Sequence, residues 1–396
     1  MKKKVLLAFS GGLDTSYCAK YLSAIKGYEV HSAIVNTGGF SGDELLRIEQ
    51  TAYKLGVTSH VILDVTADYY QKCIRYMVYG NVLRNNTYPL SVSSERTFQA
   101  LALVKYAKEI NVEAIAHGST GAGNDQVRFD SAFKILAPDV EIIAPIREMK
   151  LSRQQEIDFL KEHQIKADWE KAEYSINKGI WGTSIGGKET LTSNLALPDE
   201  AYPSQPVKTT PEKIELEFEN GEIVGLNGQK ISDKIHLINK IENIASKFAI
   251  GRDIHVGDTI IGIKGRVGFE AAAALLIIKA HHALEKHVLT KWQLFYKENL
   301  ANVYGMMLHE SQYFEPVMRD IEAFLESNQK NVTGKVFIKL MPYHFQIQGI
   351  ESKYDLMSSK FGNYGEENKS WTAQDVIGFT NIMSNQMKIY HEVNKD

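Results

Sequence analysis

Ser10-Gly11-Gly12-Leu13-Asp14-Thr15-Ser16 follows the apolar run Val5-Leu6-Leu7-Ala8-Phe9, and a helix-compatible stretch begins inside it. We interpret these pieces as a buried strand, a tight turn and the N-terminus of a helix. The glycine pair lets the backbone pass close to a bound group. The unpaired amides of the first helical turn and the neighbouring hydroxyls converge on one point, which suits an anion, most simply a phosphate.

The spacing of this turn differs from two common nucleotide loops, Gly-x-x-x-x-Gly-Lys-Ser/Thr and Gly-x-Gly-x-x-Gly. Ser-Gly-Gly-x-Asp-Ser/Thr-Ser/Thr instead resembles the pyrophosphate (PP) loop of the ATP pyrophosphatases. These enzymes cleave ATP to AMP and pyrophosphate while they adenylate a carbonyl or ureido oxygen. The alternative is an ordinary strand-to-helix corner that carries two glycines, but the hydroxyls and Asp14 stand where the PP-loop needs them.

Length and composition limit the function classes. The 396 residues, 44% of them apolar and 23% charged, suffice for two or three domains with hydrophobic cores. A net charge of −3 gives no basic surface, so we expect small substrates and no nucleic acid. Cys18 and Cys73 are far apart, which excludes a disulfide framework and a cysteine-built metal site and predicts a reducing cytoplasm.

Two apolar runs of the chain are too short to be a signal peptide or a membrane-spanning segment. The run 5–9 is too short for the core of a signal peptide, and the longest run, Ala271 to Ile278, is too short to cross a bilayer. We therefore expect a cytoplasmic protein with no membrane partner.

The first half of the chain alternates predicted strands with predicted helices. This order implies a parallel sheet covered on both faces, with ligands bound beyond the carboxyl ends of its strands. The strands are predicted at 5–9, 28–35, 61–63, 114–116 and 140–144, and the helices at 43–55, 67–78, 95–110 (capped by Ser93 or Ser94) and 152–163.

A second motif, His117 to Asp130, follows the predicted strand 114–116. Its three closely spaced glycines predict a flexible anion-accommodating loop, and a helix is predicted to start near Asn124, which places Asn124 and Arg128 on one face. Arg128 can grip a carboxylate in bidentate fashion, and Asp125 can hold a substrate ammonium or Mg²⁺. The alternative, a solvated helix start, does not require the glycine spacing.

The segments 8–16 and 117–130 together resemble the two signatures of the argininosuccinate synthase family, and the second separates that family from other ATP pyrophosphatases. The resemblance covers essentially the whole chain and weakens after Trp181. It implies ATP-dependent ligation of citrulline and aspartate through a citrullyl-adenylate, with release of AMP and pyrophosphate, and it implies Mg²⁺ and a homotetramer.

The resemblance also implies roles for individual residues. Asp14, Asp125 and Arg128 are the expected catalytic residues. Those expected to hold ATP are Ala8, Phe9, Ser10, Gly11, Gly12, Leu13, Asp14, Thr15, Ser16, Val35 and Gly118. Those expected to hold citrulline are Tyr88, Ser93, Asn124, Arg128, Ser175 and Ser184, and those for aspartate are Thr120, Asn124 and Asp125. Ser175 and Ser184 lie in a segment, 173–184, that we interpret as an irregular substrate loop.

The second half of the chain loses the alternating pattern. It predicts hairpins around Asn220-Gly221 and over 335–348, helices over 232–248, 269–287, 292–308 and 373–393, and a strand over 259–264. We therefore expect an α/β nucleotide-binding domain over 1–165, an α+β synthetase domain over 166–365 and a helical tail over 366–396. The tail packs either on a neighbouring subunit or on its own domain.

Two sequence features resemble a nucleotide loop and a metal site, but we assign no site to either. Gly182 to Lys188 fits Gly-x-x-x-x-Gly-Lys, but Glu189 follows it in place of Ser or Thr, so we do not expect a second nucleotide loop. His281, His282 and His287 have no carboxylate at a recognised ligand spacing, so we expect surface residues and assign no metal ligands.

The chain departs from the family pattern at one end of the citrulline site. Gly257 aligns with a family glutamate and Phe269 with a family tyrosine, and both family side chains contact citrulline. A buried α-ammonium without such partners is costly. Either Asp258 takes over the role, or the substrate is an N-acylated citrulline such as the acetyl or succinyl form. Two rival functions also remain: another ATP pyrophosphatase, and a non-catalytic ATP-binding sensor.

Overall fold

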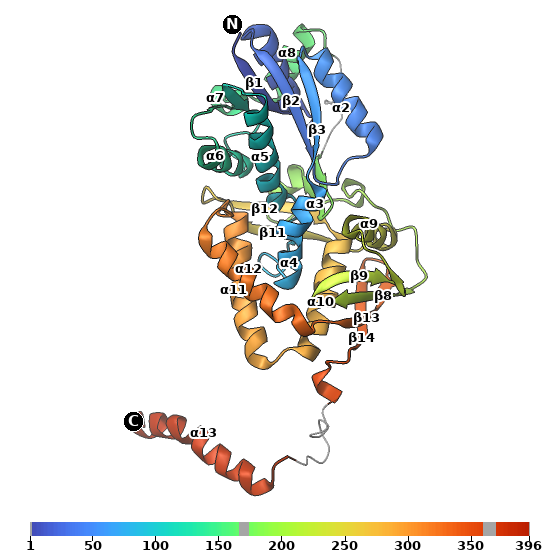
Figure 1. The fold of residues 1–396 in the computed structure, drawn as a ribbon, viewed down its shortest axis with the longest axis vertical. Coiled ribbons are helices and arrows are strands. Elements are labelled where there is room, and N and C mark those ends of the chain that lie inside the picture. Colours follow the sequence, from blue (N-terminus) through green and yellow to red (C-terminus); the bar gives the residue numbers. More distant parts are fainter. Residues whose placement is uncertain (1, 166–173, 359–369, 396) are drawn as a thin grey trace.

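The N-terminal part of the chain is built on a five-stranded parallel sheet in the order β3-β2-β1-β4-β5. The computed structural model describes residues 2–165, 174–358 and 370–395 (Figure 1). The strands are β1 Lys4–Ala8, β2 Glu29–Asn36, β3 Ser59–Asp64, β4 Ala114–Ala116 and β5 Glu141–Ile143. The predicted α/β fold with a parallel sheet is confirmed.

Helices cover both faces of this sheet, because successive side chains of a strand point to opposite sides. Val5 and Leu7 of β1 pack into a core with α1, α2, α7 and α8, while Leu6 packs into a second core with α5 and α6. The bounds are α1 Leu13–Lys20 with a π-helical turn Tyr21–Ile25, α2 Gly42–Lys54, α5 Ser91–Glu109, α6 Asp125–Leu136, α7 Pro145–Met149 and α8 Arg153–Glu162.

Strand order brings the two sequence motifs together. β1 lies between β2 and β4, so the chain leaves β1 and β4 at neighbouring points of the carboxyl edge. The turn 10–16 follows β1 and the loop 117–124 follows β4. This is the switch point at which open α/β sheets bind ligands.

One N-terminal segment belongs to the core of the other half. The helix predicted over 67–78 is α3 Thr66–Tyr69, a π-helical turn Tyr70–Ile74 and α4 Arg75–Tyr79. Tyr69 and Met77 are fully buried in one core with Leu216 and Tyr304, which come from the second half of the chain. The predicted domain boundaries after residues 165 and 365 adjoin or fall within undescribed residues, and they stay predictions.

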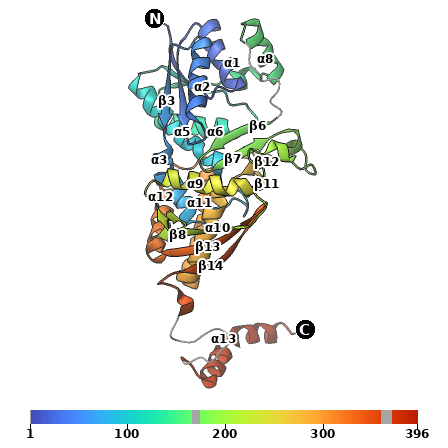
Figure 2. The ribbon, with the colours of Figure 1, turned by 90° about the vertical axis from the view of Figure 1, so that its right-hand side faces the viewer.

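The second half contains two antiparallel sheets with helices packed around them (Figures 1 and 2). One has the order β10-β9-β8-β13-β14 and the other β11-β12-β7-β6. The strands are β6 Ser175–Gly179, β7 Gly182–Gly186, β8 Glu212–Glu219, β9 Glu222–Leu226, β10 Gln229–Lys230, β11 Arg252–Asp258, β12 Lys264–Glu270, β13 Gly334–Met341 and β14 His344–Glu351. The helices are α9 Lys234–Ala245, α10 Ala272–Val288, α11 Lys291–His309 and α12 Pro316–Ser327, with short 3-10 turns at Lys188–Leu191, Asp199–Ala201, Ser246–Phe248, Asn328–Asn331 and Leu356–Ser358.

The structure corrects several local predictions. The described part of the segment 173–184 is not irregular: it forms most of the β6–β7 hairpin, while residue 173 lies outside the described residues. The strand predicted over 259–264 is instead the turn between β11 and β12, closed by a hydrogen bond from Thr259 N to the Ile263 carbonyl (2.8 Å). Gly182 to Lys188 begins with strand β7, so it is not a nucleotide loop, as expected.

Three further details differ from the sequence prediction. Ser93 and Ser94 do not cap α5: the helix begins at Ser91, and both hydroxyls donate to the Leu90 carbonyl. α12 was not predicted. His281 is not a surface residue, since it is fully buried and bonded to Asn81 and Gln329.

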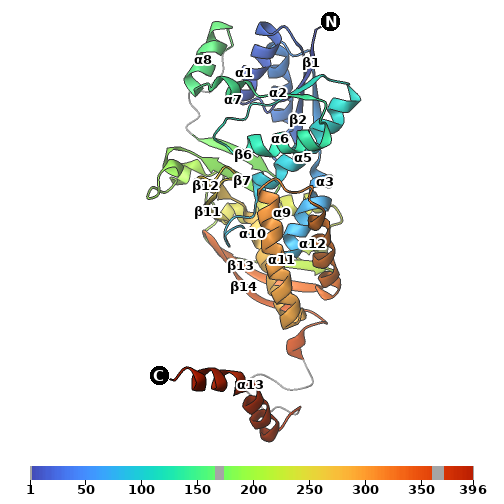
Figure 3. The same cartoon turned by 90° about the vertical axis from the view of Figure 1, so that its left-hand side faces the viewer.

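The C-terminal helix α13, Ala373–Val393, stands away from the rest of the chain (Figures 1 and 3). None of its described residues is buried, and Ile377, Ile382, Met383 and Met387 are all exposed. Packing on its own domain is therefore not what the structure shows, and packing on a neighbouring subunit stays a prediction. Within the described ranges, no helix combines the length and apolar character that crossing a bilayer requires.

A substitution at Gly39, just after β2, can test how closely the two halves of the chain approach each other. A Cβ at this position would collide with the backbone carbonyl of Lys178 on β6, which has no side-chain freedom to yield. We expect Gly39→Ala to lower the free energy of unfolding by about 1–3 kcal/mol in denaturant titrations. Gly42→Ala is the matched control, since nothing lies within 4 Å of its added methyl. Equal stability of the two variants would contradict the close contact.

Candidate active site

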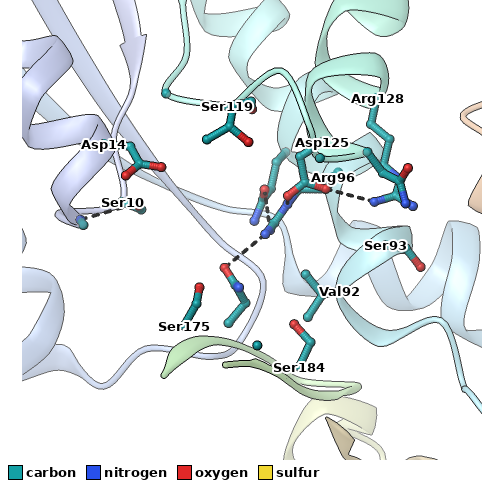
Figure 4. Close-up of a pocket in the computed structure, with 18 of the residues that line it drawn as sticks. Ser10, Asp14, Val92, Ser93, Arg96, Ser119, Asp125, Arg128, Ser175 and Ser184 are labelled. Carbon is teal, nitrogen blue, oxygen red and sulfur yellow. Dashed lines mark hydrogen bonds and ion pairs between the residues drawn. The ribbon is translucent and has the colours of Figure 1, made fainter. Parts of the chain in front are cut away.

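A cavity of about 1140 Å³ lies at the carboxyl edge of the parallel sheet and extends to the β6–β7 hairpin and the end of α11 (Figure 4). It brings together most of the residues predicted from the sequence. Those that line it are Ala8, Phe9, Ser10, Gly12, Leu13, Asp14, Thr15, Val35, Tyr88, Ser93, Gly118, Thr120, Asn124, Asp125, Arg128, Ser175 and Ser184.

Three predicted site residues do not line the cavity. Gly11 shapes the turn through its backbone, whose φ of +77° favours glycine. Ser16 is fully buried beneath the turn. Phe269 is also fully buried and packs behind Tyr88, with ring centroids 5.3 Å apart, so it supports the wall of the cavity.

The turn after β1 presents an anion site. α1 begins at Leu13 with Gly12 as its N-cap, and no side chain caps the helix, so the first amides keep no intrahelical partner. The Ser10 and Thr15 hydroxyl oxygens are 3.3 Å apart, and the Gly12 amide lies 3.5 Å from Ser10 Oγ. Amides, hydroxyls and the positive end of the helix dipole together suit a phosphate.

Gly118 joins the second loop to this turn. A Cβ at Gly118 would lie 3.2 Å from the Asp14 Cβ and 3.2 Å from the Thr15 Cγ2. Such contacts are tighter than ordinary van der Waals packing, so the loop approaches the turn this closely only without a side chain at position 118.

A carboxyl pair lies beside the turn. Asp14 is hydrogen-bonded to Glu156 of α8. Burial raises the pKa of Asp14, and burial together with the Asp14 charge raises the pKa of Glu156 to about 8. Glu156 therefore keeps its proton at neutral pH.

Asp125 is held between two guanidinium groups (Figure 4). Arg96 Nε donates to Asp125 Oδ2 at 2.8 Å, and Arg128 Nη1 donates to Asp125 Oδ1 at 2.9 Å. Burial alone would raise the pKa of Asp125, but the two arginines outweigh it and lower the pKa to about 2. Asp125 is therefore ionised at neutral pH and can pair with a substrate ammonium.

The second half of the chain completes this cluster. Arg128 Nε and Nη2 donate to the His309 carbonyl at the end of α11, at 3.3 and 3.1 Å. Arg96 Nη2 donates to Asn177 Oδ1 on β6 at 3.2 Å, and Asn124 Oδ1 accepts the Ile260 amide at 2.9 Å. The amino-acid end of the cavity therefore needs both halves of the chain.

A hydrogen-bonded chain fixes the loop that carries these residues. His117 Nδ1 accepts the Ser119 amide at 3.2 Å, so His117 Nε2 carries the proton and donates to Asp130 at 2.9 Å. Arg147 of α7 donates to the other Asp130 oxygen at 2.8 Å. The glycine-rich loop thus starts from a rigid base.

Both halves of the chain match one family. Residues 4–166 match the family described as arginosuccinate synthase N-terminal HUP domain, and residues 174–390 match arginosuccinate synthase C-terminal domain. The argininosuccinate synthases of Methanocaldococcus jannaschii and Dictyoglomus thermophilum are each 37% identical to this chain over 393 and 391 residues, which covers 98% of every chain. That of Xanthomonas campestris is 34% identical over 405 residues, with 99% coverage of both chains.

The chain belongs to the argininosuccinate synthase family. The resemblance drawn from the two motifs is confirmed, and the cavity shows how an argininosuccinate synthase fold brings these motifs to one site.

Sequence reasoning missed four side chains of this argininosuccinate synthase site. Arg96 lies in the first turn of the helix predicted over 95–110, three residues after Ser93, so its position beside a predicted citrulline residue could have indicated it. His309, Asn177 and Glu156 reach the site from distant elements, and no local pattern marks them.

Glu156 gives a pH-dependent prediction. Because its folded pKa of about 8 exceeds the ordinary value of 4.5, the folded protein binds this proton more tightly than the unfolded chain, and stability falls as pH rises from about 4.5 to about 8. We expect Glu156→Gln to reduce the fall in Tm over this range in thermal melts. Glu162→Gln, an exposed site on the same helix, is the control, and identical pH profiles of the two variants would contradict the raised pKa of Glu156.

Proposed function

We propose that this chain is an ATP-dependent carbon–nitrogen ligase of arginine biosynthesis, which joins a citrulline to aspartate to form the argininosuccinate product, with AMP and pyrophosphate released. The observation that carries the proposal is that the phosphate-binding turn and the Asn124, Asp125 and Arg128 cluster line one cavity. Membership in the argininosuccinate synthase family supports it.

The first step uses the turn after β1. The β and γ phosphates of ATP lie on the amides and hydroxyls of residues 10–16, with Val35 and Gly118 beside the nucleoside. The ureido oxygen of citrulline attacks the α phosphorus, the bond to the bridging oxygen breaks, and pyrophosphate leaves on the turn. Fixed amides aimed at the leaving group stabilise its growing charge without reorganisation.

The second step uses the loop after β4. The aspartate amine attacks the activated ureido carbon, AMP leaves with its bonding electron pair, and the nitrogen loses its proton. Thr120, Asn124 and the ionised Asp125 bind aspartate, and Tyr88, Ser93, Arg128, Ser175 and Ser184 bind citrulline. The site works by positioning and charge, and no covalent enzyme intermediate is required.

Mg²⁺ is part of this proposal. The Asp14 carboxylate and the Ser10 and Thr15 hydroxyls offer oxygen ligands at the turn, which fits a hard cation bound mainly through phosphate oxygens and water. Bound there, it would neutralise phosphate charge. We also propose a cytoplasmic homotetramer in which α13, with its exposed apolar residues, packs on neighbouring subunits.

Pyrophosphate release separates the ligase from its rivals. With ATP and a citrulline but no aspartate, we expect release of about one equivalent per site, because the adenylate forms and then waits. Aspartate should convert this into continuous turnover, and aspartate without a citrulline should give none. A non-catalytic sensor would bind ATP and release no pyrophosphate under any of these conditions.

Asp125 tests the aspartate site. Because hydrogen bonds to charged groups contribute about 1.5–3 kcal/mol, we expect Asp125→Asn to raise KM for aspartate about 10- to 100-fold in steady-state assays. Asp139→Asn, at an exposed position, is the matched control. An unchanged KM for aspartate in a folded Asp125→Asn variant would contradict the assigned role.

A further inference from the structure

One end of the cavity, beside Tyr88, holds polar groups that lack partners. His255 of β11 stacks on Tyr88 with ring centroids 5.2 Å apart and is only 6% exposed, and His309 at the end of α11 is 7% exposed. Among the described residues, His255 Nδ1, His309 Nε2 and the buried Nε of Arg84 have no hydrogen-bond partner. Both histidines line the cavity.

This end is cationic. Burial, then Arg84, lowers the pKa of His255 to about 4, and burial, then Arg128 and Arg84, lowers the pKa of His309 to about 3. Both rings are therefore neutral at pH 7, and Arg84 lies close enough to act on both. The positive charge at this end of the cavity therefore comes from arginine side chains and not from the histidines.

The described carboxylates that line the cavity have other partners, and we have assigned Asp125 to the ammonium group of aspartate. Asp125 pairs with two arginines, Asp14 with Glu156, and Glu44 with the Ser41 cap of α2. The Asp258 side chain is 63% exposed and pairs with Lys264 at 2.6 Å, so in this structure it points its charge to a lysine and not to a substrate ammonium.

Position 257 carries no acidic side chain that could pair with a substrate ammonium, and a side chain there would collide with the present position of the His255 ring. A Cβ there would lie 2.6 Å from His255 Nε2 and 3.3 Å from Asn85 Nδ2. A free citrulline with its α-ammonium at this end would meet arginines and neutral rings, and a buried ammonium without an anionic partner is strongly disfavoured.

We infer that the substrate is a citrulline acylated on its α-nitrogen, with the acyl group seated against His255 and His309, which line the cavity, and within reach of the Arg84 charge. Acylation replaces the ammonium by an uncharged amide. The acyl oxygen accepts from a ring N–H of a neutral histidine, and a terminal carboxylate on the acyl chain is attracted by the positive charge of Arg84. This inference rests on the proposed function, since the ureido group at the other end reacts with ATP and aspartate as described above.

The test compares citrulline, N-acetylcitrulline and N-succinylcitrulline as substrates of the full-length protein. Pyrophosphate release with ATP and aspartate gives kcat/KM for each. We expect kcat/KM for at least one acylated form to exceed that for citrulline at least tenfold, with the succinyl form preferred because the Arg84 charge attracts its carboxylate. A kcat/KM for citrulline equal to or above that of both acylated forms would overturn the inference.

Two variants separate binding from a structural role. We expect Arg84→Gln and His255→Gln each to raise KM for the preferred acylated form at least tenfold while kcat/KM for citrulline changes less than threefold. Arg47→Gln, on the exposed face of α2, is the control and should change neither. Equal losses with every substrate would mean that these residues only support the fold, which counts against the inference.

The outcomes distinguish this inference from the proposed function. Release with citrulline and not with its acylated forms would sink the inference and uphold the ligase. Absence of release with all three substrates, from protein that melts cooperatively, would overturn both.

Discussion

The ion pairs of the half-buried Asp125 carboxylate with two arginines are the interactions on which the site depends. The carboxylate accepts from Arg96 of α5 and Arg128 of α6, and each arginine also bonds to the second half of the chain, at Asn177 and at the His309 carbonyl. Loss of Asp125 would leave the buried Arg128 guanidinium without a carboxylate partner, which is destabilising. The charges that we propose to bind substrate therefore also join the two halves of the chain.

The two ends of the cavity present different kinds of binding groups. The end that we propose to bind the nucleotide presents backbone amides and hydroxyls of one turn, which a short stretch of sequence encodes. The amino-acid end uses charged side chains from α5, α6, β6 and α11, fixed by their mutual contacts. Gly118 couples the ends, because it packs directly on Asp14 and Thr15. Such preorganisation suits a reaction that relies on positioning.

The sequence predicted the parts of this molecule that are locally encoded. The strand, turn and helix around Ser10, the loop after His117 and the parallel sheet follow from periodicity and glycine spacing, and the structure confirms them. What depends on distant contacts was missed or misread. The β6–β7 hairpin looks irregular because its strands carry glycines and polar residues, and their pairing is set by β12. His309 and Glu156 reach the site only through tertiary packing.

The segment from α3 to α4, which contains Tyr69 and Met77, has a consequence for biosynthesis of the polypeptide. The parallel sheet has all its strands once residue 143 has left the ribosome, but these side chains share their core with Tyr304 and Leu340. Tyr69 can pack on Phe98 of α5 early in translation, but the rest of this core stays incomplete until nearly the whole chain has emerged. The nascent chain therefore exposes part of an aromatic-rich hydrophobic segment during much of its synthesis. Chaperones bind exposed hydrophobic segments of this kind.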